Sequence, residues 1–390
     1  MGRDKIAITG LGLVSPCGLG IHTLLEDYGL GRHRLVYDKG LEAWVGRLPE
    51  EINDELRELQ KKYPRVDPSA CYAILAAQRA VDEASWLDSS PDFGILIGSS
   101  RGATTRWEAE YELWSKEDRS SPFASPTTTL GNISSWVGQD LGQRGFRSSH
   151  SITCSTAAHA VVQAAAWLKS GMASRMLVGG AEAPLTTFTL AQMKALRIYC
   201  NAPAETSDRP CQPLARDEHT GMVLAEGAGV LALETGGADR ALAWVSGLGY
   251  AQENLGSPTS IDPAGAGISK AMRMALKDAD LTTVDAVVTH APGTRKGDAA
   301  EWSALQSVFE AKMPILANSK WMHGHGLGAS AAWSLGLAVA WLRSKTSVHQ
   351  LPYDHVGSAI EQAPKVPETI MINAMGFGGN CVSIILNRNK

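Results

Sequence analysis

The sequence predicts an α/β protein, on three observations. Short apolar runs with strand character alternate along the chain with longer runs that have helical apolar spacing. Of the 390 residues, 44% are hydrophobic and 19% are charged, which indicates a folded chain with a large interior. The apolar pattern of residues 6–12 also returns at residues 243–249, which is typical of an internal repeat.

The first half of the chain is expected to alternate strands and helices. Residues 6–12 predict a buried strand that enters a glycine turn, and Ser15 stands where a dinucleotide-binding loop needs its third glycine. Residues 157–168 carry no formal charge at neutral pH and end in a basic, glycine-terminated turn, as a buried helix does. We further expect a helix over residues 70–84 and strands over residues 93–97 and 176–180.

The second half is expected to begin near residue 238. A polar, turn-rich stretch over residues 201–221 predicts a surface loop or lid, and a strand over residues 223–233 follows it. We therefore divide the chain into an N-terminal half, residues 1–237, and a C-terminal half, residues 238–390. After the repeated strand, the second half is expected to contain strands over residues 286–289, 315–318, 369–375 and 382–386, and helices over residues 299–310 and from Gly328 onward.

Composition and charge exclude several classes of protein. The formal net charge of −4 and the lack of a long basic run argue against nucleic-acid binding. The N-terminus does not fit a signal peptide, and the longest nearly apolar stretch, residues 329–342, is too short to cross a bilayer. The six cysteines form no Cys-x-x-Cys pair, which argues against a metal site or a disulfide framework and favours a reducing, cytoplasmic location.

Cys154 directly precedes the predicted buried helix over residues 157–168. A helix N-terminus offers free N–H groups and the positive end of the helix dipole, and this field favours the thiolate form. Cys154 is therefore a candidate nucleophile, and the alternative is a small buried residue, as most free cysteines are.

Two histidines lie in comparable turns. His290 follows a predicted strand, the place where α/β proteins carry their chemistry, and His325 lies at the entry to the apolar helix near Gly328. A cysteine and two histidines in such turns indicate covalent catalysis, and they leave a cysteine hydrolase open.

Taken together, these segments resemble the β-ketoacyl-(acyl carrier protein) synthases of the elongating, Cys-His-His type. The resemblance covers nearly the full length and keeps the order and spacing of the family's motifs. It implies the thiolase fold, in which two similar α/β halves form a five-layered αβαβα core, and it implies a dimer. The matching segments are residues 8–12, 15–18, 98–102, 131–132, 151–160, 179–183, 227–231, 290–301, 320–329 and 376–379.

The resemblance implies a decarboxylative Claisen condensation. Cys154 would take an acyl group from a carrier-protein thioester, and the enolate formed from malonyl carrier protein would attack that acyl group. His290 and His325 would donate ring N–H groups to the enolate oxygen, which requires neutral imidazoles. The backbone N–H groups of Cys154 and Phe377 would form the other oxyanion hole.

Five further residues receive supporting roles from the resemblance. Lys320 would shape the electric field around His325, with Glu301 as its ion-pair partner. Phe377, in a glycine-rich loop with Gly378, would gate the acyl pocket. Thr294 would provide a hydroxyl beside His290.

The resemblance implies neither a bound cofactor nor a metal. The substrates would arrive on the phosphopantetheine of an acidic acyl carrier protein, which favours a modest basic patch on this chain. The protein would form a homodimer, or a heterodimer with a related ketosynthase-like subunit.

The chain departs from the family's pattern around the malonyl and gating loops. Pro292 stands where the family has a threonine, and it brings no N–H and a fixed φ. Asn380 and Cys381 stand where the family has Thr-Asn, Gln212 replaces an acidic residue, and Met375 replaces a phenylalanine. These departures favour a condensing enzyme of a specialised type II fatty acid, polyketide or polyene pathway.

Two alternatives stay open. The chain could be a non-catalytic or weakly catalytic subunit that determines chain length for a partner, although such subunits usually lose the cysteine that is kept here. It could also be a thiolase or acyltransferase that does not decarboxylate. A degradative thiolase needs a Cys-x-Gly segment that Cys381 does not provide, and a starter-type synthase would have asparagine in place of His325.

Overall fold

In a computed structural model, most strands of the protein form one continuous hydrogen-bonded sheet, and three further strands form a small separate sheet. The structure describes residues 5–87, 92–130, 132–205, 208–217, 220–236, 238–254, 256–257, 259–310, 312–358 and 366–388. The 11-stranded sheet is continuous because strand β1 (Ile6–Ser15) pairs antiparallel with both β9 (Gly227–Thr235) and β10 (Ala243–Gln252). The β1–β10 pairing joins two groups of strands, one from each half of the chain.

The two groups have the same internal strand order. The first group runs β6-β5-β7-β9-β1 and the second runs β12-β11-β13-β14-β10, so each reads third, second, fourth, fifth and first strand in chain order. In each group, parallel strands occupy one side and antiparallel strands the other. The strands not yet given bounds are β5 (Gly94–Gly98), β6 (Arg147–Ser148), β7 (Arg175–Glu182), β11 (Ala286–Val288), β12 (Ile315–Ala317), β13 (Thr369–Gly376) and β14 (Asn380–Asn387).

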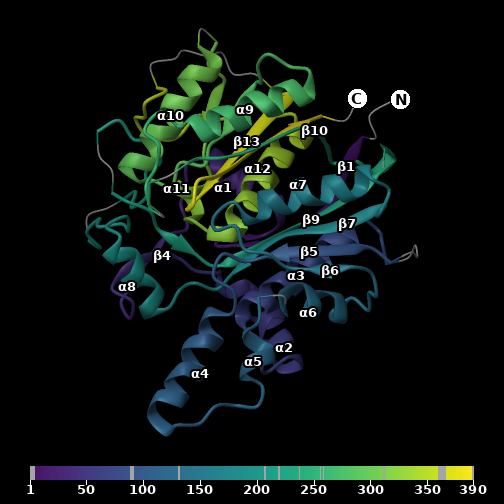
Figure 1. Ribbon diagram of the computed structural model, residues 1–390. Coiled ribbons are helices and arrows are strands. Elements are labelled where there is room, and N and C mark those ends of the chain that lie inside the picture. Colours follow the sequence, from purple (N-terminus) through teal and green to yellow (C-terminus); the bar gives the residue numbers. More distant parts are fainter. Residues whose placement is uncertain are drawn as a thin grey trace.

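Helices complete five layers (Figure 1). Helices α7 (Thr156–Lys169) and α12 (Ser330–Ser344) lie between the two strand groups and contact strands of both. Helix α3 (Pro68–Glu83) covers the outer face of the first group, and α9 (Ala266–Ala279) covers that of the second. Helices α6 (Asn132–Asp140) and α10 (Arg295–Phe309) lie beside α3 and α9 in these outer layers. The predicted α/β class and five-layered thiolase fold are confirmed.

The sequence repeat corresponds to two equivalent helix–strand contacts. A Cβ atom on Gly12 of β1 would lie 1.8 Å from the carbonyl oxygen of Ala76 in α3. A Cβ atom on Gly249 of β10 would lie 1.9 Å from the carbonyl oxygen of Ala271 in α9. In each half, therefore, glycine allows the helix backbone to lie directly against the first strand.

Most predicted elements form, with shifted ends. The strand predicted over residues 223–233 is interrupted at Glu226 and forms β8 (Leu224–Ala225) and β9. Helix α10 begins at Arg295, earlier than predicted, and a short helix, η3 (Leu327–Ala329), precedes α12. Besides the two helices described below, the remaining elements are β2 (Gly18–Leu19), α1 (Gly20–Gly29), β3 (Val36–Asp38), β4 (Ala43–Gly46), η1 (Glu50–Ile52), α2 (Asn53–Lys62), α8 (Thr187–Ala195), η2 (Ala238–Arg240) and α11 (Lys320–His323).

The stretch predicted as a surface loop or lid, residues 201–221, is only partly exposed. Its residues 206–207 and 218–219 lie outside the described residues. Cys211, Leu214 and Ala215 are buried, and the backbone N–H of Leu214 donates to the buried carboxylate of Asp298 at 2.7 Å. The prediction is therefore wrong for this part, because side chains from distant elements cover a locally polar segment.

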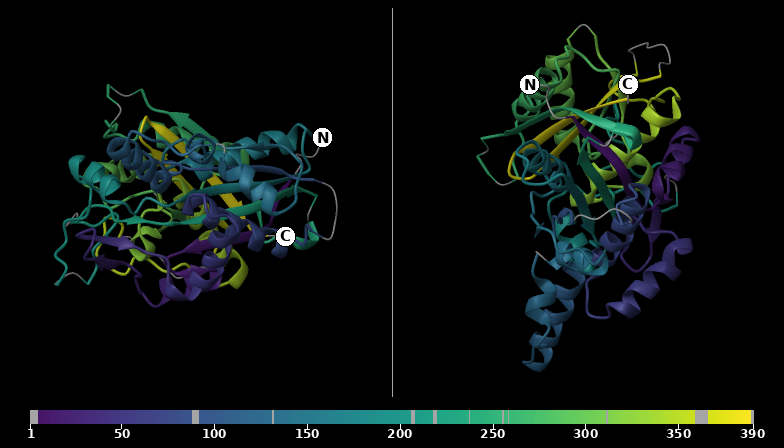
Figure 2. Two further views of the ribbon diagram at one scale, coloured as in Figure 1. Left: turned by 90° about the horizontal axis from the view of Figure 1, so that it is seen from below. Right: turned by 90° about the vertical axis from the view of Figure 1, so that its right-hand side faces the viewer.

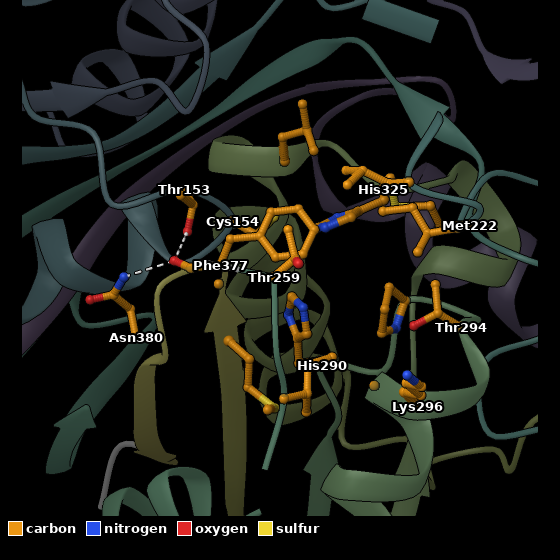
Figure 3. Close-up of a pocket in the computed structure, with 18 of the residues that line it drawn as sticks. Thr153, Cys154, Met222, Thr259, His290, Thr294, Lys296, His325, Phe377 and Asn380 are labelled. Carbon is orange, nitrogen blue, oxygen red and sulfur yellow. Dashed lines mark hydrogen bonds between the residues drawn. The ribbon is translucent and has the colours of Figure 1, made fainter. Parts of the chain in front are cut away.

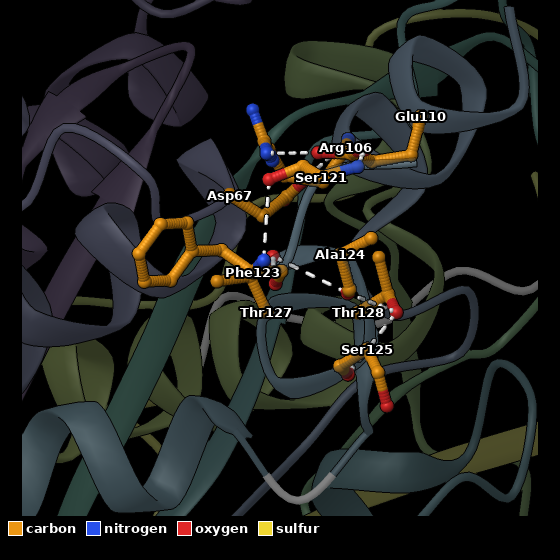
Figure 4. Close-up of polar contacts among 9 residues, drawn as sticks. All are labelled: Asp67, Arg106, Glu110, Ser121, Phe123, Ala124, Ser125, Thr127 and Thr128. Atoms are coloured by element: carbon orange, nitrogen blue, oxygen red, sulfur yellow. Dashed lines mark hydrogen bonds and ion pairs between the residues drawn. The ribbon is translucent and has the colours of Figure 1, made fainter. Parts of the chain in front are cut away.

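Helices α4 (Thr104–Glu117) and α5 (Ala124–Thr128) form an arm that projects from the body (Figure 2). At its base, Asp67 accepts the backbone N–H of Arg106 at 3.2 Å, and Glu110 bonds the Arg106 side chain and the backbone N–H of Ser121 (Figure 4). The Asp67 bond joins the arm to the body, and the Glu110 bonds link α4 with the segment that leads to α5. The exposed aromatic residues of α4 are Trp107, Tyr111 and Trp114.

Among the described residues, none of the helices has the length and apolar character needed to cross a bilayer.

Candidate active site

The candidate site is a cavity of about 720 Å³ between the two halves. Cys154, from the N-terminal half, and His290, Thr294, His325 and Phe377, from the C-terminal half, all line it (Figure 3). Five of the eight residues predicted from the sequence thus lie around one cavity. The other three are Lys320 and Glu301, which are fully buried, and Gly378, which is exposed on the loop after Phe377.

Cys154 lies just before α7, on a backbone turned sharply by Thr153. Thr153 has a φ of 47°, in the left-handed region that a β-branched residue rarely adopts. Burial and the nearby carboxyl of Glu182 raise the pKa of the Cys154 thiol to about 12, and the Lys320 ammonium acts in the opposite direction. Burial therefore works against the thiolate that the helix N-terminus is expected to favour.

The two site histidines face each other across the cavity. Their ring centroids lie 5.4 Å apart, with the planes inclined at 79°. Burial, followed by the Lys320 ammonium, lowers the pKa of each imidazole well below its usual value. Both rings are therefore neutral at physiological pH. The Nδ1 atom of His325 lies 3.0 Å from the hydroxyl oxygen of Ser330, so a serine five positions along the chain orients this ring.

Glu301 binds the loop of His290 instead of pairing with Lys320. Its two oxygens accept the backbone N–H groups of His290 at 2.9 Å and of Ala291 at 2.6 Å. Asn373 donates to the same carboxylate at 3.0 Å. No ion pair within 4 Å joins Glu301 to Lys320, so the predicted partnership is wrong. A carboxylate with three N–H donors is already satisfied, and its charge reaches the ammonium only at longer range.

Lys320 is a buried ammonium at the N-terminus of α11. Burial lowers its pKa to about 8, and the nearby Glu301 carboxylate acts in the opposite direction. The charge of Lys320 lowers the pKa of the Cys154 thiol and of the His290 and His325 imidazoles. It does not line the cavity itself.

The carbonyl of Phe377 is held from two sides. The hydroxyl of Thr153 donates to it at 3.2 Å and the amide of Asn380 donates to it at 3.0 Å (Figure 3). The next residue, Gly378, accepts a bond from the Gln252 amide at 3.1 Å. Side chains thus fix a loop whose glycines would otherwise leave it free, and the short sequence motif gave no sign of these donors.

Pro292 lines the cavity beside His290. The turn after it is closed by Asp298, which accepts the backbone N–H groups of Gly293 at 3.0 Å and Thr294 at 3.1 Å. Pro292, which stands where the family has a threonine, therefore lies in the candidate site itself.

Part of the cavity wall was not predicted from the sequence. Apolar side chains from four separate segments meet on it, together with the polar residues Ser100 and Arg101. Only the folded chain brings these segments together, so the sequence did not predict their place in the wall, although residues 98–102 match a family motif. The apolar members are Met193, Leu196, Ile198, Met222, Ile261 and Leu327.

Comparison with known proteins was consistent over the whole chain. The family model described as "Beta-ketoacyl synthase, N-terminal domain" matches residues 3–237, and "Beta-ketoacyl synthase, C-terminal domain" matches residues 242–354. The 3-oxoacyl-[acyl-carrier-protein] synthase 2 of Staphylococcus aureus (strain N315) is 30% identical over 416 residues, covering 99% of both chains. The protein of the same name from Rhizobium meliloti (strain 1021) is 30% identical over 417 residues, covering 98% of this chain and 99% of the other.

The chain belongs to the β-ketoacyl synthase family. The assignment to the acyltransferases of this family is thereby confirmed.

Solved ketosynthases share the fold at lower identity. The ishigamide ketosynthase/chain length factor superposes with a TM-score of 0.87 at 20% identity, covering all of both chains. A β-ketoacyl synthase from Burkholderia phymatum STM815 has a TM-score of 0.87 at 21% identity, covering 99% of this chain and 100% of the other.

Proposed function

We propose that this β-ketoacyl synthase family member condenses an acyl group on Cys154 with malonyl carrier protein, with loss of CO₂. The observation that carries the proposal is that two neutral, mutually facing imidazoles share one cavity with a cysteine. A cysteine hydrolase would instead pair the thiol with a basic imidazole.

The first half-reaction would transfer the acyl group. The sulfur of Cys154 attacks the thioester carbonyl, the carbon–sulfur bond to the carrier breaks, and the thiol proton leaves with the released pantetheine thiol. Because the resting thiol is neutral, the proton is lost only as attack proceeds. Gly376 lies against the Cys154 amide, where an added Cβ would be 3.2 Å from that nitrogen. This approach supports the backbone N–H groups of Cys154 and Phe377 as donors to the developing oxyanion.

The second half-reaction would form the carbon–carbon bond. Loss of CO₂ from the malonyl group leaves an enolate, whose carbon attacks the acyl carbonyl and releases Cys154. Neutral His290 and His325 each have one ring N–H to donate to the enolate oxygen, and Ser330 orients the ring of His325. The Lys320 ammonium, whose pKa burial lowers to about 8, would set the field around both rings. No metal or bound cofactor enters either step.

The pathway is proposed to be specialised, in type II fatty acid, polyketide or polyene synthesis. The supporting observations are Pro292 in the cavity wall and Asn380 on the Phe377 carbonyl, two positions at which the sequence departs from the family's pattern. The partners would be an acyl carrier protein with its phosphopantetheine arm and a second ketosynthase-like subunit, identical or related. One solved structure with a similar fold is a type II polyketide synthase acyl carrier protein in complex with its ketosynthase.

A second candidate is a chain-length-determining subunit of a ketosynthase heterodimer. Pro292 favours it, because this residue brings neither hydroxyl nor N–H to the malonyl side of the cavity. Retention of Cys154, His290, His325 and Lys320 favours the catalytic role.

Intact-mass measurement of the purified protein with acyl carrier protein tests the first half-reaction. We expect a gain of one acyl group in the wild type and none in Cys154→Ala. No gain with any acyl donor would favour the second candidate.

A further inference from the structure

Arg101 is a cation in the wall of the cavity that contains Cys154. It follows strand β5, in a loop fixed at several points. The hydroxyl of Ser99 accepts the backbone N–H of Gly102 at 2.8 Å, and the hydroxyl of Ser151 donates to the carbonyl of Ser100 at 3.1 Å. The backbone N–H of Ser100 donates to the buried carboxyl of Glu182. Arg101 is therefore presented to the cavity by a rigid loop.

The guanidinium of Arg101 has far fewer acceptors than donors. It carries five N–H donors. Among the described residues, the side chain makes one hydrogen bond, from Nη2 to the side-chain oxygen of Gln192 at 2.5 Å. Its Nε atom is buried and has no acceptor. Glu182 is near enough to interact with Arg101 through the field but is not within ion-pair distance. Most N–H groups of the guanidinium therefore have no acceptor among the described residues.

The rest of this part of the wall is apolar. Met193 lies on α8 next to Gln192, and Leu196 and Ile198 follow it along the chain. An acyl chain on Cys154 that fills this space displaces water from the guanidinium. A plain alkyl chain would leave buried N–H groups without acceptors, which is unfavourable, whereas an oxygen atom on the chain would accept from them.

We infer that Arg101 selects acyl groups that carry an oxygen acceptor, such as an oxo group or a carboxylate, over plain alkyl chains. The inference rests on the proposed function, since it concerns the acyl group that Cys154 accepts. It assigns Arg101 a binding role that touches the chain and takes no part in bond making.

The test compares thioesters that differ only in the acyl chain. Hexanoyl-, 5-oxohexanoyl- and adipoyl-pantetheine have matched length, and octanoyl- and 7-oxooctanoyl-pantetheine place the oxygen deeper. The rate of Cys154 acylation is followed by intact mass. We expect the wild type to react with at least one oxygenated donor about tenfold or more faster than with its alkyl counterpart. A comparison of the 5-oxohexanoyl and adipoyl thioesters shows whether Arg101 prefers a neutral oxo group or a carboxylate.

Arg101→Met should remove this preference, by slowing the oxygenated donors and accelerating the alkyl ones. Lys61→Met is the matched control, because Lys61 is an exposed lysine paired with Glu58 and lies outside the cavity lining. It should keep the wild-type ratio. Equal rates for alkyl and oxygenated donors in the wild type would overturn the inference, and that result does not depend on whether Arg101→Met folds. A wild type that no donor acylates would instead contradict the proposed function.

Discussion

The carboxylate of Glu301 accepts the backbone N–H of His290 at 2.9 Å. Through this bond, and the neighbouring bond from Ala291, helix α10 fixes the loop that carries His290. Glu301 therefore acts on the His290 loop through the backbone, whereas Lys320 acts on the imidazoles through its charge. The two residues support the same site by separate routes.

Glu301→Ala should impair condensation more than acylation. The substitution leaves buried N–H groups without acceptors, at a cost of about 1–3 kcal/mol each, and frees the His290 loop, while Cys154 on the other half stays in place. Acyl transfer to Cys154 and its discharge by malonyl carrier protein, measured separately, check this. Glu310→Ala, at the exposed end of α10, is the control. Equal loss of both half-reactions would mean that Glu301 only maintains the fold.

The reactivity of Cys154 should rise with pH. Because its thiol has a pKa of about 12, alkylation by iodoacetamide should accelerate about tenfold per pH unit from pH 7. The rise should become less steep above about pH 8, where Lys320 loses the charge that lowers the thiol pKa. Lys320→Met should be slower than the wild type near pH 7. A rate that levels off below pH 8 would show a stabilised thiolate and contradict this description of the resting site.

Asn380→Ala should loosen the Phe377 loop. It removes one of two side-chain donors to the Phe377 carbonyl, worth about 1 kcal/mol, so the loop should open several-fold more often. The expected readout is faster hydrolysis of acyl-Cys154 in the absence of malonyl carrier protein. Asn254→Ala, at an exposed asparagine outside the cavity lining, should leave the hydrolysis rate unchanged. If the acyl-enzyme of Asn380→Ala is as long-lived as that of the wild type, Asn380 does not restrain the loop.

Gly12→Ala and Gly249→Ala should each destabilise the protein by about 1–3 kcal/mol, because the added methyl group would overlap a helix carbonyl. Gly29→Ala, at the end of α1 with no atom within 4 Å of the added carbon, should change the free energy of unfolding little. Urea unfolding checks the three variants. A stability of Gly249→Ala equal to that of Gly29→Ala would mean that the second half does not use its glycine as the first half does.

The sequence predicted the fold and the residues that share the cavity better than it predicted how those residues are held. Apolar periodicity located α3, α7 and β1, and the ordered motifs singled out Cys154, His290 and His325, which line one cavity in the folded chain. The predicted ion pair between Glu301 and Lys320 was wrong, because the carboxylate accepts the backbone N–H groups of the His290 loop instead. That contact depends on tertiary packing. Burial raises the pKa of the Cys154 thiol and so opposes the expected effect of the helix, and a local motif carries no information on desolvation. The apolar wall and the place of Arg101 within it could not be predicted, because their segments meet only in the folded chain.

The most direct test of the account is the discharge of acyl-Cys154 by malonyl carrier protein in a single turnover. We predict that the wild type loses its acyl mass, releases one CO₂ per acyl-enzyme and forms a β-ketoacyl product. His325→Ala should hold the acyl group but discharge it at least about a hundredfold more slowly. An acyl-enzyme that forms and then resists malonyl carrier protein in the wild type, both alone and with a ketosynthase-like partner, would contradict the proposal that this chain catalyses condensation.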